Sequence, residues 1–155
     1  MDIKVSHIEI MVVNIDLKSK LNIIINRKFT AAYIQQYHIE KHFPWLNTIV
    51  KEGKLLGKGK IKPKGCKKEY EILIVYDINN TLRKERVFVI NDSQIQFDKT
   101  PHLYPDNSLC LYYPEDIPQH LDLNFIDVIP WISEWLVIYE LWKKYGVWLA
   151  DEVKH

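Results

Sequence analysis

Four prolines between residues 100 and 120 constrain the fold of this chain more than any other feature of its sequence. They are Pro101, Pro105, Pro114 and Pro118. Proline has no backbone N–H group and clashes with the preceding turn of a helix, so no long helix or internal strand runs through such a segment. We therefore expect a long, ordered loop. Loops of this length inside a compact domain tend to carry function.

A helix is predicted over residues 17–42. Its apolar residues recur at steps of three and four with polar residues between them, which is helical periodicity. They are Leu21, Ile24, Ile25, Phe29, Ala32, Tyr33 and Tyr37. Asp16 is a suitable N-cap and Pro44 a suitable terminator. The preceding residues 3–13 fit either a strand or an extension of this helix.

The middle of the chain predicts an antiparallel meander of three strands. Short segments rich in β-branched and aromatic residues cover Leu55–Lys62, Tyr70–Tyr76 and Arg86–Ile90. Glycine, proline and asparagine residues separate these segments, as is typical of turns. A fourth extended piece is predicted near Ile95–Phe97.

A second helix is predicted after Pro130, because proline suits the first turn of a helix. Its apolar stripe steps by four, three, four and three residues through Trp131, Trp135, Ile138, Trp142 and Tyr145. Gly146 is its predicted end. We expect the tryptophans of this stripe to be core residues rather than an exposed docking surface.

Length and composition fit one domain spanning residues 1–155. Of the 155 residues, 47% are hydrophobic, which suffices for one core. No internal repeat and no linker composition divides the chain. Lys and Arg total 21 against 20 Asp and Glu, and the net charge of +1 argues against a general attraction to nucleic acid or to an anionic membrane.

The N-terminus and the apolar runs predict a soluble, cytoplasmic protein. Asp2 and Glu9 interrupt the first apolar stretch, unlike a signal peptide. No run approaches the roughly 20 apolar residues that a membrane span needs. The two cysteines form no CxxC pair and the six histidines have no regular spacing with them, so we predict free thiols and no metal site. No cofactor is predicted.

The residues best suited to chemistry gather in the proline-rich loop. Residues 100–114 contain His102, Tyr104, Asn107 and Cys110. A rigid loop suits a nucleophile, because fixed surroundings hold the sulfur for attack and loop backbone leaves N–H groups for a developing oxyanion. The alternative is that Cys110, between Leu109 and Leu111, is a small buried hydrophobe without chemistry.

The order of elements and this loop resemble a known family. A helix, a meander, a proline-rich loop with a Cys-Leu dipeptide and a final helix are similar to the α+β ubiquitin-conjugating-enzyme-like (UBC-like) fold. The chain looks closest to the bacterial branch of that family found in CBASS antiphage operons, beside a cGAS-like nucleotidyltransferase. The matching residues, over roughly residues 20–155, are Pro101, His102, Tyr104, Asp106, Asn107, Leu109, Cys110, Leu111, Pro130, Trp131, Trp135, Leu136, Tyr139, Glu140, Trp142, Gly146, Trp148, Glu152 and His155.

The resemblance implies a thioester carrier. Cys110 would accept the C-terminal carboxyl of a protein partner, implied to be the cGAS-like nucleotidyltransferase, and pass it to an amine. His102 matches the histidine of the family motif, whose usual work is to brace the loop. The asparagine that supports the oxyanion in the eukaryotic family has no direct counterpart, since Leu103 and Tyr104 follow the histidine. Tyr104, Asn107 or backbone N–H groups near Cys110 are the candidates to replace it.

The source of the activated carboxyl has two alternatives. The chain has no glycine-rich phosphate loop, so it does not itself adenylate a carboxyl with ATP. Either a separate activating enzyme supplies a thioester, or the reaction is independent of ATP. Two other functions also fit the sequence. One is a non-catalytic adaptor that binds and regulates the cyclase, and the other is a cysteine hydrolase with His102 or another histidine as base.

Cys66 and a cluster of lysines, both outside the loop, are interpreted as structural features. Cys66 lies in a basic turn and is interpreted as an incidental surface thiol. A local cluster of lysines is interpreted as protection of a sheet edge, with the binding of an acidic partner or a phosphate backbone as the alternative. The cluster consists of Lys54, Lys58, Lys60, Lys62, Lys64, Lys67 and Lys68.

Overall fold

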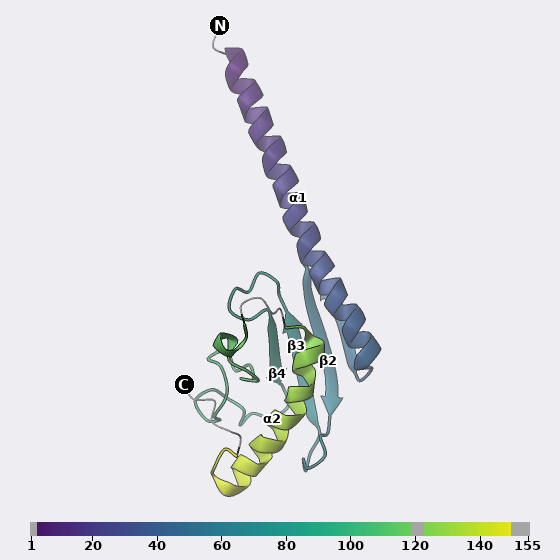
Figure 1. Ribbon diagram of the computed structural model, residues 1–155, viewed down its shortest axis with the longest axis vertical. Coiled ribbons are helices and arrows are strands. Elements are labelled where there is room, and N and C mark those ends of the chain that lie inside the picture. The colour runs from purple at the N-terminus through teal and green to yellow at the C-terminus, as the bar shows by residue number, and fades with distance from the viewer. Residues whose placement is uncertain (1–2, 119–122, 150–155) are drawn as a thin grey trace.

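The computed structural model describes residues 3–118 and 123–149 of the chain. In chain order the elements are α1 (Ile3–His42), β1 (Leu46–Lys51), β2 (Lys54–Ile61), β3 (Tyr70–Tyr76), β4 (Glu85–Val89), a 3-10 helix η1 (Pro114–Asp116) and α2 (Phe125–Tyr145). The strands pair antiparallel in the order β1-β2-β3-β4 (Figure 1). The predicted α+β architecture, with an N-terminal helix, a meander and a C-terminal helix, is confirmed.

Strand β1 was not predicted, and it precedes the expected meander. It pairs with β2 through a two-residue turn, Glu52 and Gly53, whose φ angles are 54° and 70°. Two residues with positive φ match the twist of the flanking strands, and glycine adopts this backbone conformation without strain. The side chain of Lys28 also passes so close that a Cβ at Gly53 would lie 2.5 Å from it.

The fourth extended piece predicted near Ile95–Phe97 is wrong. Consecutive turns occupy this segment, because the Ile95 N–H donates to the Asp92 carbonyl at 3.1 Å and the Thr100 N–H donates to the Gln96 carbonyl at 2.9 Å. Side chains complete the turns, since the Gln94 N–H donates to the Asp92 carboxylate at 3.0 Å. Local hydrogen bonds of this kind compete with strand pairing.

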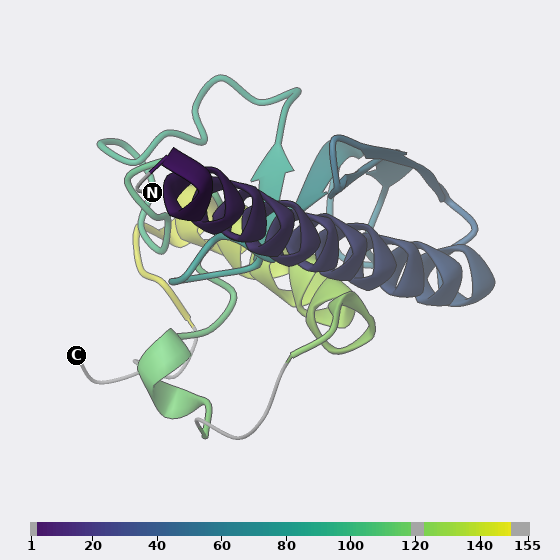
Figure 2. The same ribbon diagram turned by 90° about the horizontal axis from the view of Figure 1, so that it is seen from above.

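The core lies between one face of the sheet and the two helices. Alternate strand residues form its sheet side: Leu46, Leu55, Tyr70, Ile72, Ile74, Tyr76, Val87 and Val89. Helix α1 adds Ala32 and Ile39, and α2 adds Ile132, Leu136 and Tyr139, all fully buried. Figure 2 shows both helices on the same side of the sheet. Of the predicted core tryptophans, Trp135 is buried, whereas Trp131 and Trp142 are partly buried.

A buried glutamine of α1 holds the start of α2. The side chain of Gln35 accepts a hydrogen bond from the Phe125 N–H at 3.1 Å and donates to the Asn124 side chain at 2.7 Å. It thereby satisfies one of the backbone donors that a helix N-terminus leaves without a partner. Helix α2 therefore begins before Pro130, which lies in its second turn rather than its first. Gly146 ends the helix as predicted, with a φ of 72°.

Helix α1 is longer than predicted and extends beyond the sheet (Figure 1). Residues 3–13 are a helical extension, so Asp16 is inside the helix and the predicted N-cap is wrong. The helix ends at His42, just before Pro44, as predicted. Every residue from Leu17 to Arg27 is exposed, and the buried positions of α1 begin with Ala32. Residues 17–27 of α1 therefore do not cover the sheet.

Deletion of residues 1–26 is expected to leave the stability of the remaining domain unchanged within about 0.5 kcal/mol, as for surface changes away from packed features. The physical reason is that residues 17–26 bury no side chain against the sheet. Urea denaturation followed by tryptophan fluorescence measures the difference, because all five tryptophans lie after residue 44. A loss of several kcal/mol would show that the first half of α1 supports the core.

The lysine cluster does not protect a sheet edge, so that interpretation is wrong. Strand β2, which carries three of the lysines, lies between β1 and β3 and has no open edge. Four of the seven lysines form ion pairs with acids on or around β3 and after β4: Lys54 with Asp77 at 3.0 Å, Lys58 with Glu71 at 2.9 Å, Lys60 with Glu69 at 3.7 Å and Lys68 with Asp92 at 2.7 Å. These pairs offset part of the positive charge of the cluster.

No helix in the described part of the chain combines the length and the apolar character of a membrane span.

Candidate functional site

The predicted cysteine loop is a small hairpin. Its turn covers Tyr104 to Asn107, closed by a hydrogen bond from the Asn107 N–H to the Tyr104 carbonyl at 2.8 Å. Asn107 has a φ of 65°, a conformation that asparagine tolerates better than most residues. Past the turn, the Tyr104 N–H donates to the Ser108 carbonyl at 2.9 Å, and the Cys110 N–H donates to the His102 carbonyl at 3.0 Å. Cys110 therefore ends the returning arm of the hairpin.

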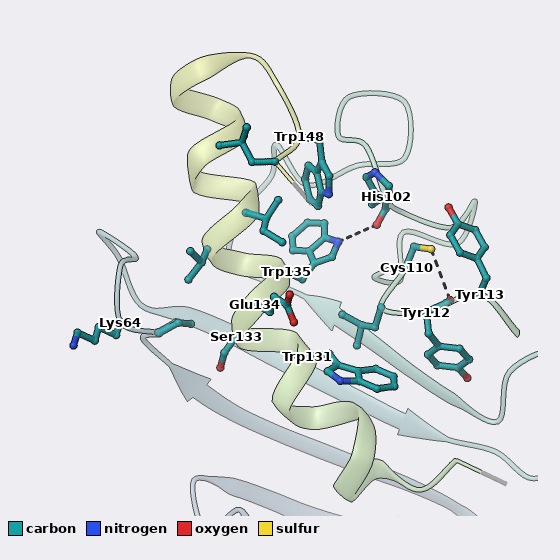
Figure 3. A pocket seen from close by; sticks show the side chains of 15 residues that line it. Lys64, His102, Cys110, Tyr112, Tyr113, Trp131, Ser133, Glu134, Trp135 and Trp148 are labelled. Carbon is teal, nitrogen blue, oxygen red and sulfur yellow. Dashed lines mark hydrogen bonds between the residues drawn. The ribbon is translucent and has the colours of Figure 1, made fainter. Parts of the chain in front are cut away.

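Two backbone contacts anchor this hairpin to the core. On the sheet side, the Leu109 N–H donates to the Val87 carbonyl of β4 at 2.8 Å. On the helix side, the indole N–H of Trp135 in α2 donates to the His102 carbonyl at 3.1 Å (Figure 3). That carbonyl also accepts from the Cys110 N–H, so the position of the cysteine is tied directly to a buried tryptophan.

Arg83 braces the other side of the hairpin. Its guanidinium group lies 3.3 Å from the centre of the Tyr104 ring and donates to the Ser108 hydroxyl at 2.8 Å. It also lies 3.5 Å from the Asp106 carboxylate. Arg86 of β4 approaches the same carboxylate at 3.6 Å. Although burial alone would raise it, hydrogen bonds from Ser108 and the two arginine charges hold the pKa of Asp106 below its usual value.

The sulfur of Cys110 is half-buried and faces a group of tyrosines. It lies 3.8 Å from the Tyr112 carbonyl oxygen. The hydroxyl of Tyr104 donates to the same carbonyl at 2.6 Å. Tyr113, the next residue, turns its hydroxyl toward the sulfur (Figure 3). On this side the thiol therefore contacts polar groups rather than a packed apolar core.

The pKa values of the two neighbouring phenols reflect this contact with the sulfur. Burial is the largest cause of the raised pKa of Tyr104, and a hydrogen bond with Cys110 and the charge of its thiolate add to it. Burial and the same two interactions with Cys110 raise the pKa of Tyr113 to about 12. Both phenols thus keep their protons at neutral pH and are able to donate hydrogen bonds.

A groove of about 860 Å³ opens beside the sulfur, between the cysteine loop and α2. Its lining is largely aromatic and aliphatic, and includes His102, Cys110, Leu111, Tyr113, Trp131, Trp135, Val137, Ile138, Trp148 and Leu149. Lys64 and Glu134 also line it. The thiol is therefore reachable from a mostly apolar depression, which is the usual character of a ligand site.

The four predicted site residues occupy different positions around this groove. Cys110 and His102 line it, with the His102 ring stacked on Trp148 at 4.7 Å between centroids. Tyr104 lies beside the sulfur, because its hydroxyl and the Cys110 sulfur both contact the Tyr112 carbonyl. Asn107 is at the far tip of the hairpin, where its side-chain oxygen accepts from the Phe97 N–H at 2.8 Å. The structure thus brings three of the four residues together.

Several contributors to the site were missed in the sequence. Tyr113 follows the cysteine by three residues and was within the loop already singled out. Arg83 and Glu85 come from the segment before the loop. The carboxylate of Glu85 is buried and accepts a hydrogen bond from the Tyr112 hydroxyl. Burial raises the pKa of Glu85, although that hydrogen bond opposes the change. No local sequence spacing indicates Arg83 and Glu85, because only the folding of the chain brings them next to the loop.

Cys66 is buried, so its interpretation as a surface thiol is wrong. It packs with the core residues, and only 8% of its surface is exposed. Burial and the nearby Glu140 carboxylate raise the pKa of its thiol to about 11, and the opposing charge of Lys143 does not compensate. The two cysteines therefore differ in accessibility, and Cys110 is the one that lines a groove.

Within the described ranges, no three His, Cys, Asp or Glu side chains are grouped so as to hold a metal ion. The polar groups around Cys110 are suited to holding a thiol and a carbonyl group. A thiol at the edge of a groove is a candidate nucleophile.

Comparison with known proteins identifies the family. No curated protein matches the chain. A family model described as "Type II CBASS E2 protein" matches residues 35–155, which include the sheet, the cysteine loop, the groove and α2. The match begins within α1, near the first of its buried positions. With most of its length matched, the chain belongs to the family of Type II CBASS E2 proteins.

Proposed function

We propose that this protein carries an acyl group on Cys110 as a thioester and transfers it to an amine. The acyl donor is the C-terminus of a protein partner, and the cGAS-like nucleotidyltransferase of a CBASS operon is the partner we propose. The observation that carries the proposal is the position of the Cys110 sulfur, half-buried at a groove and held by a hairpin that is anchored to both β4 and α2.

The groove supports a protein tail as the donor. The groove of about 860 Å³ accommodates an extended C-terminal segment, because its lining follows α2 for about two turns, from Trp131 to Ile138. Most of that lining is apolar, so side chains of the tail are bound by burial rather than by charge. Its terminal carbonyl carbon reaches the sulfur where the groove meets the cysteine loop.

Each residue of the loop has a distinct role in the proposal. Cys110 is the nucleophile. His102 positions it, since the His102 carbonyl receives the Cys110 N–H and the Trp135 indole N–H. Tyr104 fixes the Tyr112 carbonyl beside the sulfur. Asn107 maintains the hairpin turn through Phe97, and we assign it no contact with the acyl group.

Co-expression with a neighbouring cyclase, followed by intact-mass measurement, tests the proposal. The expected result is a covalent adduct of protein plus cyclase that dithiothreitol removes, because a thioester exchanges with thiols. Cys110→Ala abolishes the adduct, and Cys110→Lys converts it into a thiol-resistant amide. Cys66→Ala is the matched control and retains the adduct, since Cys66 is buried away from the groove.

Two other outcomes would contradict the proposal, each pointing to another function. An adaptor binds the cyclase equally well with Cys110→Ala and forms no adduct in any variant. A cysteine hydrolase releases the tail of a conjugate without an acceptor amine, and loses this activity when its histidine base is replaced. Addition of an activating enzyme and ATP distinguishes the two sources of the activated carboxyl.

A further inference from the structure

We propose that Tyr113 is a catalytic residue of this site, whose hydroxyl donates a hydrogen bond to the carbonyl oxygen of the acyl group while Cys110 attacks it. The identity of the natural acyl group rests on the proposed function, whereas the test below uses small probes and does not depend on it. Tyr113 thus supplies the hydrogen-bond donor that acyl transfer to a thiol needs for its developing oxyanion.

The hydrogen bonds of the loop leave Tyr113 as the best-placed donor. The Tyr104 hydroxyl donates its hydrogen bond to the Tyr112 carbonyl at 2.6 Å. The Cys110 N–H donates its hydrogen bond to the His102 carbonyl at 3.0 Å. Asn107 faces Phe97 at the tip of the hairpin. Like Tyr104, Tyr113 interacts with the Cys110 thiol through its side chain, and unlike Tyr104 it lines the groove together with Cys110.

The position of Tyr113 also fits the path of an incoming acyl group. Its side chain lines the groove together with Cys110, and its hydroxyl points toward the sulfur from the loop side (Figure 3). The carbonyl oxygen of an acyl group on Sγ is only two bonds from the sulfur. A donor that touches the sulfur therefore also reaches that oxygen. The raised pKa of Tyr113, about 12, keeps its proton in place at neutral pH.

The chemical step is a nucleophilic addition followed by elimination. The thiolate of Cys110 forms the S–C bond, and the electron pair of the C=O double bond moves to oxygen. The Tyr113 O–H stabilises this oxyanion by a hydrogen bond and keeps its proton. When the oxyanion collapses, the bond to the leaving thiolate or alkoxide breaks and that group takes the electron pair. In the second half-reaction an amine adds, loses a proton to solvent, and expels the Cys110 thiolate.

Two small probes test the assignment on the full chain without any partner. p-Nitrophenyl acetate acylates the sulfur through an oxyanion and releases p-nitrophenolate, whereas iodoacetamide alkylates it by displacement of iodide with no oxyanion. Rates are measured at a pH above the ordinary titration range of thiols, and Cys110→Ala supplies the background. Tyr113→Phe is expected to slow acylation about 100-fold, the usual effect of removing one oxyanion donor. Alkylation stays near that of the unaltered chain.

Two further variants provide the controls. Tyr145→Phe removes the hydroxyl of an exposed residue that does not line the groove, and changes neither rate. Tyr104→Phe loosens the Tyr112 carbonyl and changes both rates together, so their ratio stays constant. The assignment is overturned if Tyr113→Phe changes both rates in parallel or neither, or if the unaltered chain shows no Cys110-dependent acylation.

The outcome of this test is separate from that of the conjugation test. A Tyr113-dependent acylation without a cyclase adduct supports the role of Tyr113 and contradicts the proposed function. An adduct that forms while Tyr113→Phe acylates normally supports the proposed function and contradicts the role of Tyr113.

Discussion

Replacement of Trp135 by alanine is expected to destabilise the protein by about 3–5 kcal/mol, the usual cost of removing a large aromatic side chain from a core. The indole is only 4% exposed. It stacks on Tyr139 at 5.4 Å between centroids and contacts Trp148 at the same distance. Its N–H group also donates to the His102 carbonyl. The variant therefore loses packing and a hydrogen bond together.

Trp135→Phe separates these two contributions. Phenylalanine keeps most of the apolar contact but has no N–H group, so the expected loss is smaller, about 1–2 kcal/mol. Urea denaturation followed by far-UV circular dichroism measures both variants, and Trp131→Ala is the control because Trp131 is only partly buried. If Trp135→Ala costs no more than Trp131→Ala, the indole does not anchor the cysteine loop to the core.

Helical periodicity and the composition of the strand segments predicted most of the fold, because both are local properties of the sequence. The stripe through Trp135 and Tyr145 marked α2, and the β-branched segments marked β2, β3 and β4. The errors occur where contacts with residues distant in the sequence determine where an element begins. Helix α2 begins five residues before Pro130, at Phe125, because Gln35 of α1 caps it across the core.

The missed strand β1 has a different cause. Its turn is Glu52-Gly53, which lacks the Asn-Gly or Asp-Gly signal of a two-residue hairpin. The segment Ile95–Phe97 has the composition of a strand, yet the Asp92 carbonyl before it and the Gln96 carbonyl within it accept local hydrogen bonds. Propensity alone does not distinguish these cases, since pairing depends on a partner strand elsewhere in the chain.

The candidate site was predicted in part for the same reason. The proline-rich loop and its cysteine are local features, so the sequence indicates them directly. The chemistry around the sulfur depends on which side chains turn toward it, and this depends on the hairpin register. Asn107 and Tyr113 each lie three residues from Cys110, on opposite sides of it in sequence. Only Tyr113 lines the groove with it.

Asp92 links the turns before the cysteine loop to α2 and to the segment before β3. Its side chain is 6% exposed and lies 2.7 Å from the Lys68 ammonium and 3.9 Å from that of Lys143. The Tyr139 hydroxyl donates to it at 3.2 Å, and the Gln94 N–H at 3.0 Å. Although burial alone would raise the pKa of Asp92, the hydrogen bonds from Lys68 and Gln94 and the charge of Lys68 lower it below the usual value.

Asp92→Asn is therefore expected to reduce stability by about 2 kcal/mol at neutral pH, less than the 3–5 kcal/mol of a fully buried pair because both lysines are partly exposed. A carboxyl group with a lowered pKa in the folded state contributes its stability above the pKa of the unfolded chain, about 3.9 for aspartate. That contribution disappears as the pH falls through the folded pKa. The difference between the two proteins should thus be constant from neutral pH to about pH 5 and shrink below about pH 4.

Urea denaturation at a series of pH values measures this difference in stability, and Asp98→Asn, at an exposed position, is the control that shows no such dependence. A stability difference that stays constant down to pH values well below 3.9 would mean that the packing of Asp92, and not its charge, holds these elements together.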